Sequence, residues 1–533
     1  MVSREYDGLA GAGGVKDVCR QLAEALVAEA GLEVTVVLPR YGFMDAVQSG
    51  FSPLPLTDGL HVDFCGDRAR QDCVVAMDYP DKERRETVSF WQQQRKGVRV
   101  ILVESARFAE KLGVYTYTAR EEEAESWKKK GSGHYDYFAM NILLQKAALA
   151  VMVHLGERPD VIHCHDGHAA TLAALMRELP GQRHYFSRSG TVVTIHNAGI
   201  GYHQEIADIP FARAVTGLPV SVIEDGMLGT RFDPFVVASG YAVMNTVSEN
   251  YARELQETGE DARTGWLGHH LLKRGVRLAG VTNGINPEDF NPEQAERLGL
   301  AAPFNPRGDL TGKRRCKEDI LSACNGGTRW QKVEQVGSLQ LEPDLPLFTF
   351  IGRMSAQKGV DVLAKSLDLL PSETRLQILV LGSGDPKLED AVANLAVGVD
   401  ERCRVCYLRG YDPLLANRIY AAGDFFLIPS LYEPCGLTDY IAQLMGNLPI
   451  VHLVGGLVKV EDGKTGFGYV EHSAGALAST MERAISIFAH DRKRIRSMQR
   501  AAVERIYSHH TWKQAMAGYL DLYEQARKMA CRY

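Results

Sequence analysis

Short, uninterrupted apolar runs recur along most of this chain and alternate with amphipathic helical patterns. Clear examples of the runs lie at residues 161–164, 191–195, 347–351 and 376–381. Strands that are covered on both faces are continuously apolar, whereas strands with one face in water alternate apolar and polar residues. Between the runs, side chains such as Val360, Leu363 and Leu367 follow helical spacing. This β-α-β-α rhythm predicts an α/β fold in which crossover helices connect parallel strands.

The rhythm is interrupted between residues 286 and 346, where Pro303 and Pro306 fall in a stretch without sheet-like runs. Such a stretch is typical of a domain junction. At 533 residues the chain is also too long for one compact core. We therefore expect two α/β domains, at residues 1–280 and 281–510, followed by a helix at 511–533 that packs back on the N-terminal domain.

Composition and charge narrow the class of protein. The formal net charge is −6, which gives no electrostatic reason to bind nucleic acid. No run approaches the roughly 18 apolar residues of a membrane-spanning helix, and the N-terminus lacks the apolar core of a secretory signal. The ten cysteines are scattered, as expected for buried thiols in a reducing compartment. We expect a cytoplasmic enzyme with no membrane or nucleic-acid partner, no cofactor and no metal.

A glycine cluster at residues 11–14 stands directly before the helix that begins near Lys16. Glycines let backbone N–H groups approach an anion, and a helix N-terminus adds partial positive charge. The spacing differs from the dinucleotide fingerprint, since Lys16 stands where its third glycine belongs, so a phosphate site and an ordinary turn both remain open. Few residues precede the cluster, and we expect either a very short first strand or further residues upstream. A similar turn, residues 382–385, follows the run at 376–381.

Two cations lie in another loop between a strand and a helix, at Arg353 and Lys358. At the carboxyl edge of a parallel sheet, such a pair suits a diphosphate. Two solvated surface cations are the alternative interpretation, and the loop alone leaves both open.

The segment at residues 429–438 follows an apolar run and places Glu433 between an aromatic residue and a proline. A carboxylate in this position can accept hydrogen bonds from sugar hydroxyls. The Gly-Leu-Thr that follows can open a helix and offer donors to a phosphate. A capped helix start explains Thr438 equally well, but it does not explain Glu433.

Histidines end two of the predicted strands. His163, His165 and His168 lie at the end of one run, and His196 with Asn197 follows the next. The spacing places His163 and His165 on one strand face, which leaves a metal site open. Polar residues at the ends of parallel strands equally form substrate contacts, and no further carboxylate or cysteine cluster completes a set of metal ligands. We favour a shared polar cleft over a metal site.

Taken together, these segments resemble the bacterial glycogen synthase and starch synthase family. These are retaining glycosyltransferases with two Rossmann-like domains that face each other across a cleft, the GT-B architecture. In the N-terminal half the resemblance rests on Gly13-Gly14…Asp17, His165-Asp166-Gly167-His168-Ala169, Thr194-Ile195-His196-Asn197, Thr246-Val247-Ser248 and Asn283-Gly284. In the C-terminal half it rests on Arg353…Gln357-Lys358-Gly359, Gly382-Ser383-Gly384-Asp385-Pro386, Gly410-Tyr411, Glu433-Pro434-Cys435-Gly436-Leu437-Thr438 and Gly455-Gly456-Leu457.

The resemblance implies transfer of glucose from a nucleotide-glucose donor, with ADP-glucose favoured, to the non-reducing end of an α-1,4-glucan such as glycogen. Arg353 and Lys358 would neutralise the departing diphosphate. Glu433 would contact the transferred glucose, and His196 would lie near its anomeric carbon. Tyr411 would stack on the nucleobase. The other implied substrate contacts are Gly13, Gly14, Asp17, Asp166, His168, Asn197, Asn283, Gly384, Cys435, Gly436, Leu437 and Thr438.

The chain departs from the family's pattern at three places. The family's Lys-Thr-Gly-Gly reads Gly11-Ala12-Gly13-Gly14, so its phosphate-binding lysine is missing, and Lys16 lies beyond the glycines. The aromatic of His-Asp-Trp-His is Gly167, which affects the acceptor side. After the glycine pair 455–456 and Leu457, the usual Ala-Asp-Thr-Val reads Val458-Lys459-Val460-Glu461, so we expect a different local geometry at the donor site.

Two other functions stay open because of these departures. One is a related retaining glycosyltransferase with a small acceptor, and the other is a non-catalytic protein that binds sugar nucleotides or glucans. No residue stands out as a nucleophile, which favours attack on the same face of the sugar over a covalent intermediate. An enzyme is favoured by the presence of Arg353, Lys358, Glu433 and His196.

Overall fold

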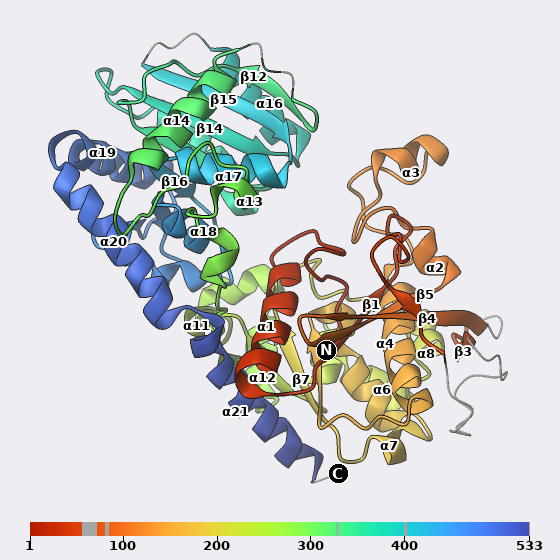
Figure 1. Cartoon of the computed structure of the whole chain (residues 1–533). Helices are drawn as coiled ribbons and strands as arrows, with labels where there is room; N and C mark the ends of the chain where they lie inside the picture. Colours follow the sequence, from red (N-terminus) through yellow and green to blue (C-terminus); the bar gives the residue numbers. More distant parts are fainter. Residues whose placement is uncertain (56–71, 80–84, 327, 329, 399–401, 532–533) are drawn as a thin grey trace. The chain divides into compact units, whose positions relative to one another are not determined.

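The computed structural model divides the chain into two compact units (Figure 1). Unit 1 comprises Met1–Gly284 together with Trp512–Tyr533, and unit 2 comprises Ile285–Thr511. The structure describes every residue except 56–71, 80–84, 327, 329, 399–401 and 532–533. Each unit has its own hydrophobic core around a largely parallel sheet, which is the α/β class that the sequence rhythm predicts.

The sheet of unit 1 is parallel at its centre. Its order is β5 (Val98–Glu104), β1 (Thr35–Pro39), the first residues of the chain at Val2, β6 (Val161–His165), β7 (Gly190–Ile195), β10 (Val243–Thr246) and β11 (Ala279–Gly280). A hairpin widens one edge, because β4 (Arg85–Arg95) runs antiparallel to β5 and pairs with β2 (Ser52–Pro53) and β3 (Asp72–Ala76). The apolar runs at 161–164 and 191–195 form central strands that are buried almost throughout.

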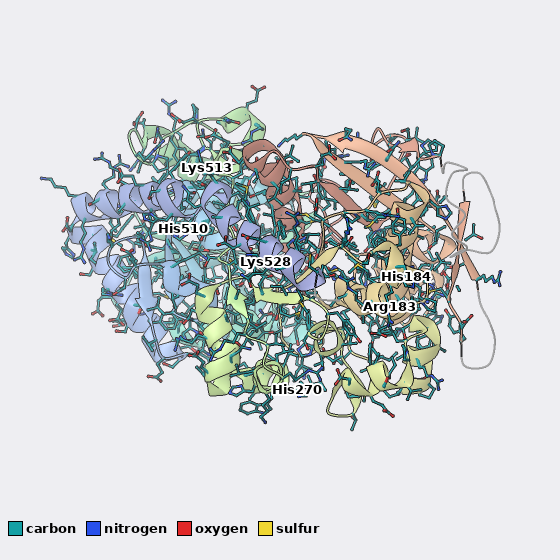
Figure 2. The ribbon with its side chains drawn as sticks, turned by 90° about the horizontal axis from the view of Figure 1, so that it is seen from below. Arg183, His184, His270, His510, Lys513 and Lys528 are labelled. Atoms are coloured by element: carbon teal, nitrogen blue, oxygen red, sulfur yellow. The ribbon has the colours of Figure 1, made fainter. Side chains whose placement is uncertain are left out.

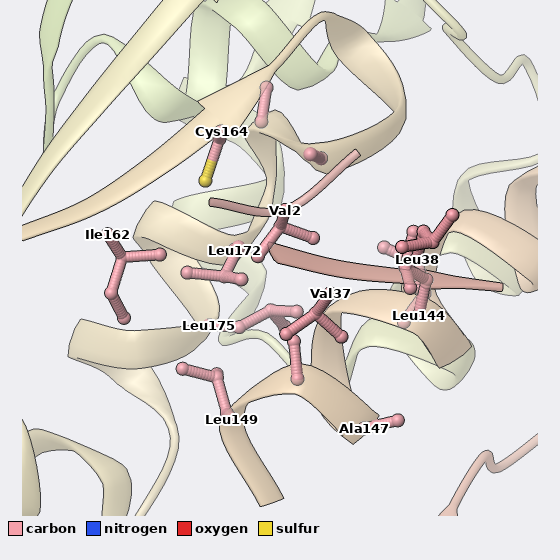
Figure 3. Close-up of a cluster of buried hydrophobic side chains, with 14 of the residues drawn as sticks. Val2, Val37, Leu38, Leu144, Ala147, Leu149, Ile162, Cys164, Leu172 and Leu175 are labelled. Carbon is pink, nitrogen blue, oxygen red and sulfur yellow. The ribbon is translucent and has the colours of Figure 1, made fainter. Parts of the chain in front are cut away.

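The first strand of unit 1 is very short. Val2 forms parallel bridges to Val37 on one side and to Cys164 on the other. Its N–H donates to His163 O at 2.9 Å, and its carbonyl accepts the His165 N–H at 3.1 Å. These bridges place one very short strand between β1 and β6. Figure 3 shows Val2 within a cluster of apolar side chains that includes Leu144, Leu172 and Leu175.

Two helices supply those side chains. They are α4 (Tyr137–His154) and α6 (Leu172–Glu178). α4 is long and apolar enough to cross a membrane, but 78% of that stretch is buried inside the unit, as in the core helix of a folded domain. The remaining elements of unit 1 include α2 (Ala106–Ala109), α3 (Ala119–Ala124), α5 (Gly167–Ala170), α7 (Gln182–Tyr185), α8 (Ile209–Thr216), α9 (Val220–Asp225), β8 (Met227–Leu228), β9 (Arg231–Phe232), α10 (Pro234–Ala238), α11 (Glu249–Glu257), η1 (Gly259–Thr264) and α12 (Leu267–Lys273).

The last helix, α21 (Trp512–Ala530), belongs to unit 1 although it follows unit 2 in the sequence. It lies against β7 and against α1 (Val15–Ala30). At its start, Trp512 Nε1–H donates to Gln21 Oε1 of α1 at 2.7 Å. Further along, the Tyr523 hydroxyl lies 2.9 Å from His163 Nδ1 of β6. Figure 2 shows this helix with labels at residues 513 and 528, near its two ends.

Unit 2 contains one seven-stranded sheet. Its order is β12 (Val333–Gly337), β15 (Cys403–Gly410), β14 (Leu376–Gly382), β13 (Leu347–Ile351), β16 (Phe425–Ile428), β17 (Leu448–His452) and β18 (Phe467–Tyr469). β12 is antiparallel to β15, and the other neighbours are parallel. The helical elements include η2 (Pro287–Phe290), α13 (Ala295–Leu298), α14 (Thr311–Cys324), η3 (Ala356–Lys358), α15 (Val360–Leu367), α16 (Pro386–Val397), α17 (Pro413–Ala422), α18 (Thr438–Leu444), η4 (Gly455–Lys459), α19 (Ala474–His490) and α20 (Arg492–His509).

Both sheets reverse their strand order once. In unit 2 the chain forms β13, β14 and β15 in one direction and then returns to β16 on the other side of β13. In unit 1 it forms the strand at Val2, then β1 and β5, and returns to β6 on the other side of Val2. In doubly wound α/β sheets, ligands bind outside the carboxyl ends of the strands at this reversal. The loops after β13 and β16, and those after Val2 and β6, are therefore where a site is expected.

Candidate functional site

At the reversal in unit 2, an ammonium group and a carboxylate meet. Lys358 ends η3 in the loop after β13, and Glu433 lies in the loop after β16. Lys358 Nζ lies 2.6 Å from Glu433 Oε2, and the two side chains are 23% and 13% exposed. The Ser430 hydroxyl donates to the same carboxylate oxygen at 3.0 Å. Two groups far apart in the sequence thus form a partly open, charged site at the edge where the topology predicts a ligand.

Backbone contacts lock these two loops together. The Leu431 N–H donates to Gln357 O at 2.8 Å. Gly359 has a φ of +68°, and a Cβ at this position would lie 1.9 Å from Pro429 O, so no other residue fits here. The distance between the ammonium and the carboxylate is therefore set by the loops and not only by the two flexible side chains.

The other residues predicted around this site lie at the carboxyl ends of neighbouring strands. Arg353 is exposed, and its Nη2 lies 3.5 Å from Gln357 Oε1 in the same loop. Gly384 lies in the turn after β14, and its N–H donates to Glu389 Oε1 at 2.6 Å. Tyr411 directly follows β15 and is 58% exposed, and its stacking role stays a prediction. Because β13, β14 and β15 are adjacent, these residues share one edge of the sheet.

The loop that leads into α18 packs tightly against the glycine pair at 455–456. A Cβ at Gly456 would lie 2.1 Å from Cys435 O. Cys435 and Gly436 are buried, whereas Leu437 and Thr438 are partly exposed. Within the described part of the chain, the N–H groups of Gly436 and Leu437 donate to no acceptor. Both N–H groups are therefore donors that no described acceptor of the chain uses.

In unit 1 the glycine loop already holds an anion, which is a carboxylate of the chain itself. Glu5 is 1% exposed, and its Oε2 accepts the N–H groups of Ala12 at 2.7 Å and Gly13 at 3.0 Å. Its Oε1 accepts the Tyr115 hydroxyl at 2.7 Å. The turn therefore has anion-binding geometry, but an external phosphate at the Gly13 amide would have to displace Glu5. Gly14 caps the N-terminus of α1.

Lys16 occupies the space that a side chain at residue 11 would need. A Cβ built on Gly11 would lie 2.2 Å from Lys16 Cδ. Lys16 Nζ pairs with Asp17 Oδ1 at 2.7 Å and with Asp7 Oδ1 at 3.3 Å. Burial alone would lower the pKa of Lys16, but the two carboxylates raise it overall. Although Lys16 follows the glycines in the sequence, its side chain thus runs back over the position of the missing lysine.

Asp166 joins the ends of β6 and β7. Its φ of +59° is rare for a residue other than glycine. Its Oδ1 accepts the His196 N–H at 2.6 Å and the Asn197 N–H at 3.4 Å. Burial raises the pKa of Asp166 to about 8, against the opposing effect of these N–H groups. One oxygen of this predicted substrate contact is therefore used to position His196.

Three imidazoles stack in the interior at the same strand ends. The ring centroids of His163 and His165 are 4.2 Å apart, and His165 Nδ1 lies 3.0 Å from His196 Nε2. The ring nitrogens of His163 contact the hydroxyls of Tyr523 and Thr194. Burial lowers the pKa of His196 to about 3, so this imidazole is neutral at pH 7. The three imidazoles lie in the interior of unit 1, and whether this segment lines a polar cleft stays a prediction. No three His, Cys, Asp or Glu side chains among the described residues are grouped to hold a metal.

The glycine at position 167 has a steric cause. A Cβ at Gly167 would lie 2.0 Å from His203 O. His203 is fixed in turn, because its Nδ1 lies 2.7 Å from Asp233 Oδ2 and its Nε2 lies 2.6 Å from Ala198 O. Burial opposes protonation of His203, but Asp233 raises its pKa overall. An aromatic side chain at position 167 does not fit while this loop keeps its path.

Two further predicted contacts in unit 1 are buried and bonded within the unit. His168 is 2% exposed, and its Nε2 accepts the Arg4 N–H at 3.0 Å. Asn283 is 3% exposed, and its Oδ1 accepts the Tyr519 hydroxyl at 3.2 Å. Their roles toward a substrate remain predictions.

Sequence reasoning missed three polar groups of the two sites. They are Glu5 in the glycine loop, Ser430 beside Glu433, and Lys459, whose Nζ donates to Gly436 O at 2.6 Å. An acidic residue three positions after Val2 was a usable signal for Glu5, because the loops at strand ends carry the site. The departure from the family pattern at residues 458–461 indicated that the region around Lys459 differs, but it did not predict the contacts that Lys459 makes.

Comparison with known proteins gives a consistent result over both units. Residues 1–269 match the family model described as the starch synthase catalytic domain, and residues 345–486 match the model described as glycosyl transferases group 1. The chain is 30% identical to a glycogen synthase of Streptococcus sanguinis, and the match covers 96% of each chain. It is also 30% identical to a glycogen synthase of Anaeromyxobacter dehalogenans, over 98% of each chain.

Solved structures show the same fold. The catalytic domain of starch synthase IV from Arabidopsis thaliana, bound to ADP and acarbose, matches with a TM-score of 0.77 at 24% identity, over 99% of this chain and 98% of that one. Sucrose-phosphate synthase from Thermosynechococcus elongatus matches with a TM-score of 0.56 at 18% identity, over 98% and 97% of the two chains. Together with the two largely parallel sheets, each of which reverses its strand order once, these matches show an architecture of two Rossmann-like domains.

Proposed function

Since this chain belongs to the family of glycogen and starch synthases, we propose that it transfers glucose from a nucleotide-glucose donor to the non-reducing end of an α-1,4-glucan, with retention of configuration. The observation that carries the proposal is the contact of 2.6 Å between Lys358 and Glu433 at the reversal of the unit 2 sheet. One group suits a diphosphate and the other suits sugar hydroxyls. ADP-glucose is the donor that we propose, supported by the ADP in the similar starch synthase IV structure.

The donor side of the proposal is electrostatic. As the bond between the anomeric carbon and the diphosphate breaks, negative charge grows on the diphosphate oxygens. Lys358 and Arg353 supply positive charge for these oxygens, and the open N–H groups of Gly436 and Leu437 supply further donors. Glu433 accepts hydrogen bonds from the hydroxyls of the transferred glucose. Each such preorganised contact is typically worth about 3–4 kcal/mol in the transition state.

The acceptor side completes the transfer without a covalent intermediate. The 4-hydroxyl oxygen of the terminal glucan residue bonds to the anomeric carbon on the face from which the diphosphate leaves. The proton of that hydroxyl passes to the departing phosphate oxygen, so charge and atoms balance. His196, neutral because burial lowers its pKa to about 3, contacts the donor sugar as a hydrogen-bonding group and does not act as an acid.

The compartment is part of the same proposal. The structure describes free cysteines, most of them buried, among them Cys19, Cys164 and Cys435. Buried free thiols suit a reducing environment. We propose that the enzyme works in the cytoplasm, where its partners are the donor and the glucan.

One assay tests the function. The purified protein is incubated with ADP-glucose or UDP-glucose, and with glycogen or maltose, while chain growth is followed. We expect elongation of glycogen from ADP-glucose. Growth on maltose alone would indicate an enzyme with a small acceptor, and donor binding by calorimetry without turnover would indicate a binding protein.

A further inference from the structure

The loop that we assign to the donor is held by an ammonium group that the proposed mechanism does not use. Lys459 ends η4, and its Nζ donates to the carbonyl oxygens of Cys435 and Gly436. The same Nζ lies 3.2 Å from Asp439 Oδ1 and 4.3 Å from the centroid of the Tyr440 ring. The ammonium group thus donates to two carbonyl oxygens and forms an ion pair with the Asp439 carboxylate. Lys459 therefore ties the loop to the first turn of α18.

This arrangement is buried. The side chains of Lys459 and Asp439 are 7% and 0% exposed. A buried ammonium is costly unless a carboxylate and further acceptors surround it, and this one has both. Burial raises the pKa of Asp439 to about 6, while Lys459 opposes that shift. Removal of either side chain alone would leave the other charge buried without its partner, so a test has to replace both residues together.

The geometry of the peptide bond gives these contacts a consequence for the ligand. In a trans peptide the C=O and the N–H point in opposite directions, and none of the described peptides is cis. The carbonyl of Cys435 shares a peptide plane with the Gly436 N–H, and the carbonyl of Gly436 shares one with the Leu437 N–H. Since both carbonyls point to Lys459, both N–H groups point away from it. These are the two N–H groups that donate to no described acceptor.

The local backbone brings these N–H groups together. Gly436 has a φ of +72°, in the left-handed region, and Leu437 has φ −107° and ψ −27°, in the right-handed region. Successive residues of opposite hand form a concave group of N–H donors that binds anions. The loop thus has its carbonyl side closed by Lys459 and its N–H side open to an anion.

We propose that Lys459 is a positioning residue, which orients the amide N–H groups of Gly436 and Leu437 toward the diphosphate of the donor. The inference rests on the proposed function, because that function identifies the anion. The family pattern has an aspartate at this position, and a carboxylate cannot donate to the two carbonyls. The contacts of Lys459 are therefore particular to this chain, and they follow from its departure from the family pattern at residues 458–461.

The test removes both buried charges together. In the double variant Lys459→Met/Asp439→Asn, volume is nearly kept and no charge is left unpaired. The affinity for ADP is measured by calorimetry, with KM for ADP-glucose, KM for glycogen and the melting temperature. We expect the ADP dissociation constant and the donor KM to rise at least about tenfold, with KM for glycogen unchanged. The matched control is Lys464→Met, since Lys464 is 67% exposed and pairs with Glu461; it should behave as the wild type.

A second variant covers the case in which the double variant fails to fold. Lys459→Arg keeps donors for both carbonyls, and we expect it to bind ADP more tightly than the single variant Lys459→Met. The inference is wrong if the double variant binds ADP like the wild type. It is also wrong if affinity for ADP and for glycogen fall equally with the melting temperature, which would mean a purely structural role. If the wild type itself neither binds ADP nor transfers glucose, the proposed function fails and the inference falls with it.

Discussion

The two units share one topology but treat the polar groups at their sheet reversals in opposite ways. In unit 1 the glycine loop is filled by Glu5, and His196 contacts His165. The imidazoles there are buried and neutral. In unit 2 the side chains of Lys358 and Glu433 are 23% and 13% exposed. The buried polar groups at these strand ends of unit 1 are thus bonded within the unit, whereas unit 2 keeps a partly exposed ion pair and two N–H groups that donate to no described acceptor.

We propose that this difference reflects two kinds of group in the reactants, the charged diphosphate at unit 2 and neutral sugar hydroxyls at unit 1. A nucleotide diphosphate carries negative charge, which fixed cations and N–H groups stabilise. A glucan is neutral, and its hydroxyls need hydrogen-bonding groups at fixed positions. The shared topology determines where each site lies, whereas the side chains and their partners determine what the site binds.

The largest expected effect comes from removing the charge that distinguishes unit 2. For Lys358→Ala, and likewise for Glu433→Ala, we expect kcat to fall at least about a hundredfold, about 3 kcal/mol, without unfolding. Steady-state kinetics and the melting temperature measure the two effects separately. Lys365→Ala, an exposed lysine of α15, is the control. Near-normal turnover in Lys358→Ala and Glu433→Ala would show that the ion pair of unit 2 does not contribute to catalysis.

The closed packing of unit 1 predicts that the family's tryptophan cannot simply be restored. In Gly167→Trp the new Cβ would lie 2.0 Å from His203 O. We expect a loss of about 1–3 kcal/mol and a fall in melting temperature of at least about 3 °C. Gly133→Ala serves as the control, because nothing lies within 4 Å of a Cβ there. A stable Gly167→Trp with improved affinity for glycogen would contradict the steric explanation.

The neutral imidazoles predict that unit 1 loses stability in acid. The unfolded chain binds a proton at His196 near the usual pKa of about 6.5, whereas the folded unit keeps this group neutral down to about pH 3. Stability is therefore fully present above pH 6.5 and is lost as the pH falls toward 3, by about 2 kcal/mol at pH 5 for one such group.

Hydrogen exchange at pH 7.5 and 5 measures this loss in each unit. His196→Gln should reduce the pH dependence of unit 1, and replacement of the exposed His184, labelled in Figure 2, should not. An unchanged slope in His196→Gln would show that this histidine does not contribute.

The smallest expected effect concerns Lys16, which lies in the first turn of α1 after the glycine loop. Because the side chain of Lys16 runs over Gly11, we expect it to replace the missing lysine in part. Lys16→Ala should raise the donor KM about tenfold, the effect of one charged hydrogen bond. Gly11→Lys/Lys16→Ala should recover much of that loss, since the second change clears the space. Lys96→Ala, at a lysine that is 64% exposed, is the control, and a double variant no better than Lys16→Ala would refute the replacement.

Most of the central sheet could be predicted because its strands are buried on both faces. The run at 347–351 is β13, and the run at 191–195 is β7 but for one residue. Two outer strands were not predicted: β4, which lies between β5 and the short strands β2 and β3, and the edge strand β12. β4 and β12 are only partly buried and do not form apolar runs, and β12 falls in the stretch that the sequence marks as a junction.

The candidate site was predictable where it depends on strand ends and not where it depends on loop paths. Lys358 and Glu433 follow adjacent parallel strands, so topology alone brings them to one edge. The contacts of Glu5 and Lys459 depend on how a loop folds back over several residues. The position of Lys16 over Gly11 depends on one rotatable side chain, which the linear spacing does not reveal.

The position of α21 determines the order in which the two units can be completed during synthesis. Residues 1–284 leave the ribosome first, but the side of β7 that α21 covers stays bare until the last residues of unit 1 have been synthesised. Unit 2 is continuous in the sequence and can fold in the meantime, as domains generally do during synthesis. The half of the enzyme that begins synthesis first is therefore the half that is finished last, and in that interval the face of β7 that α21 covers stays exposed.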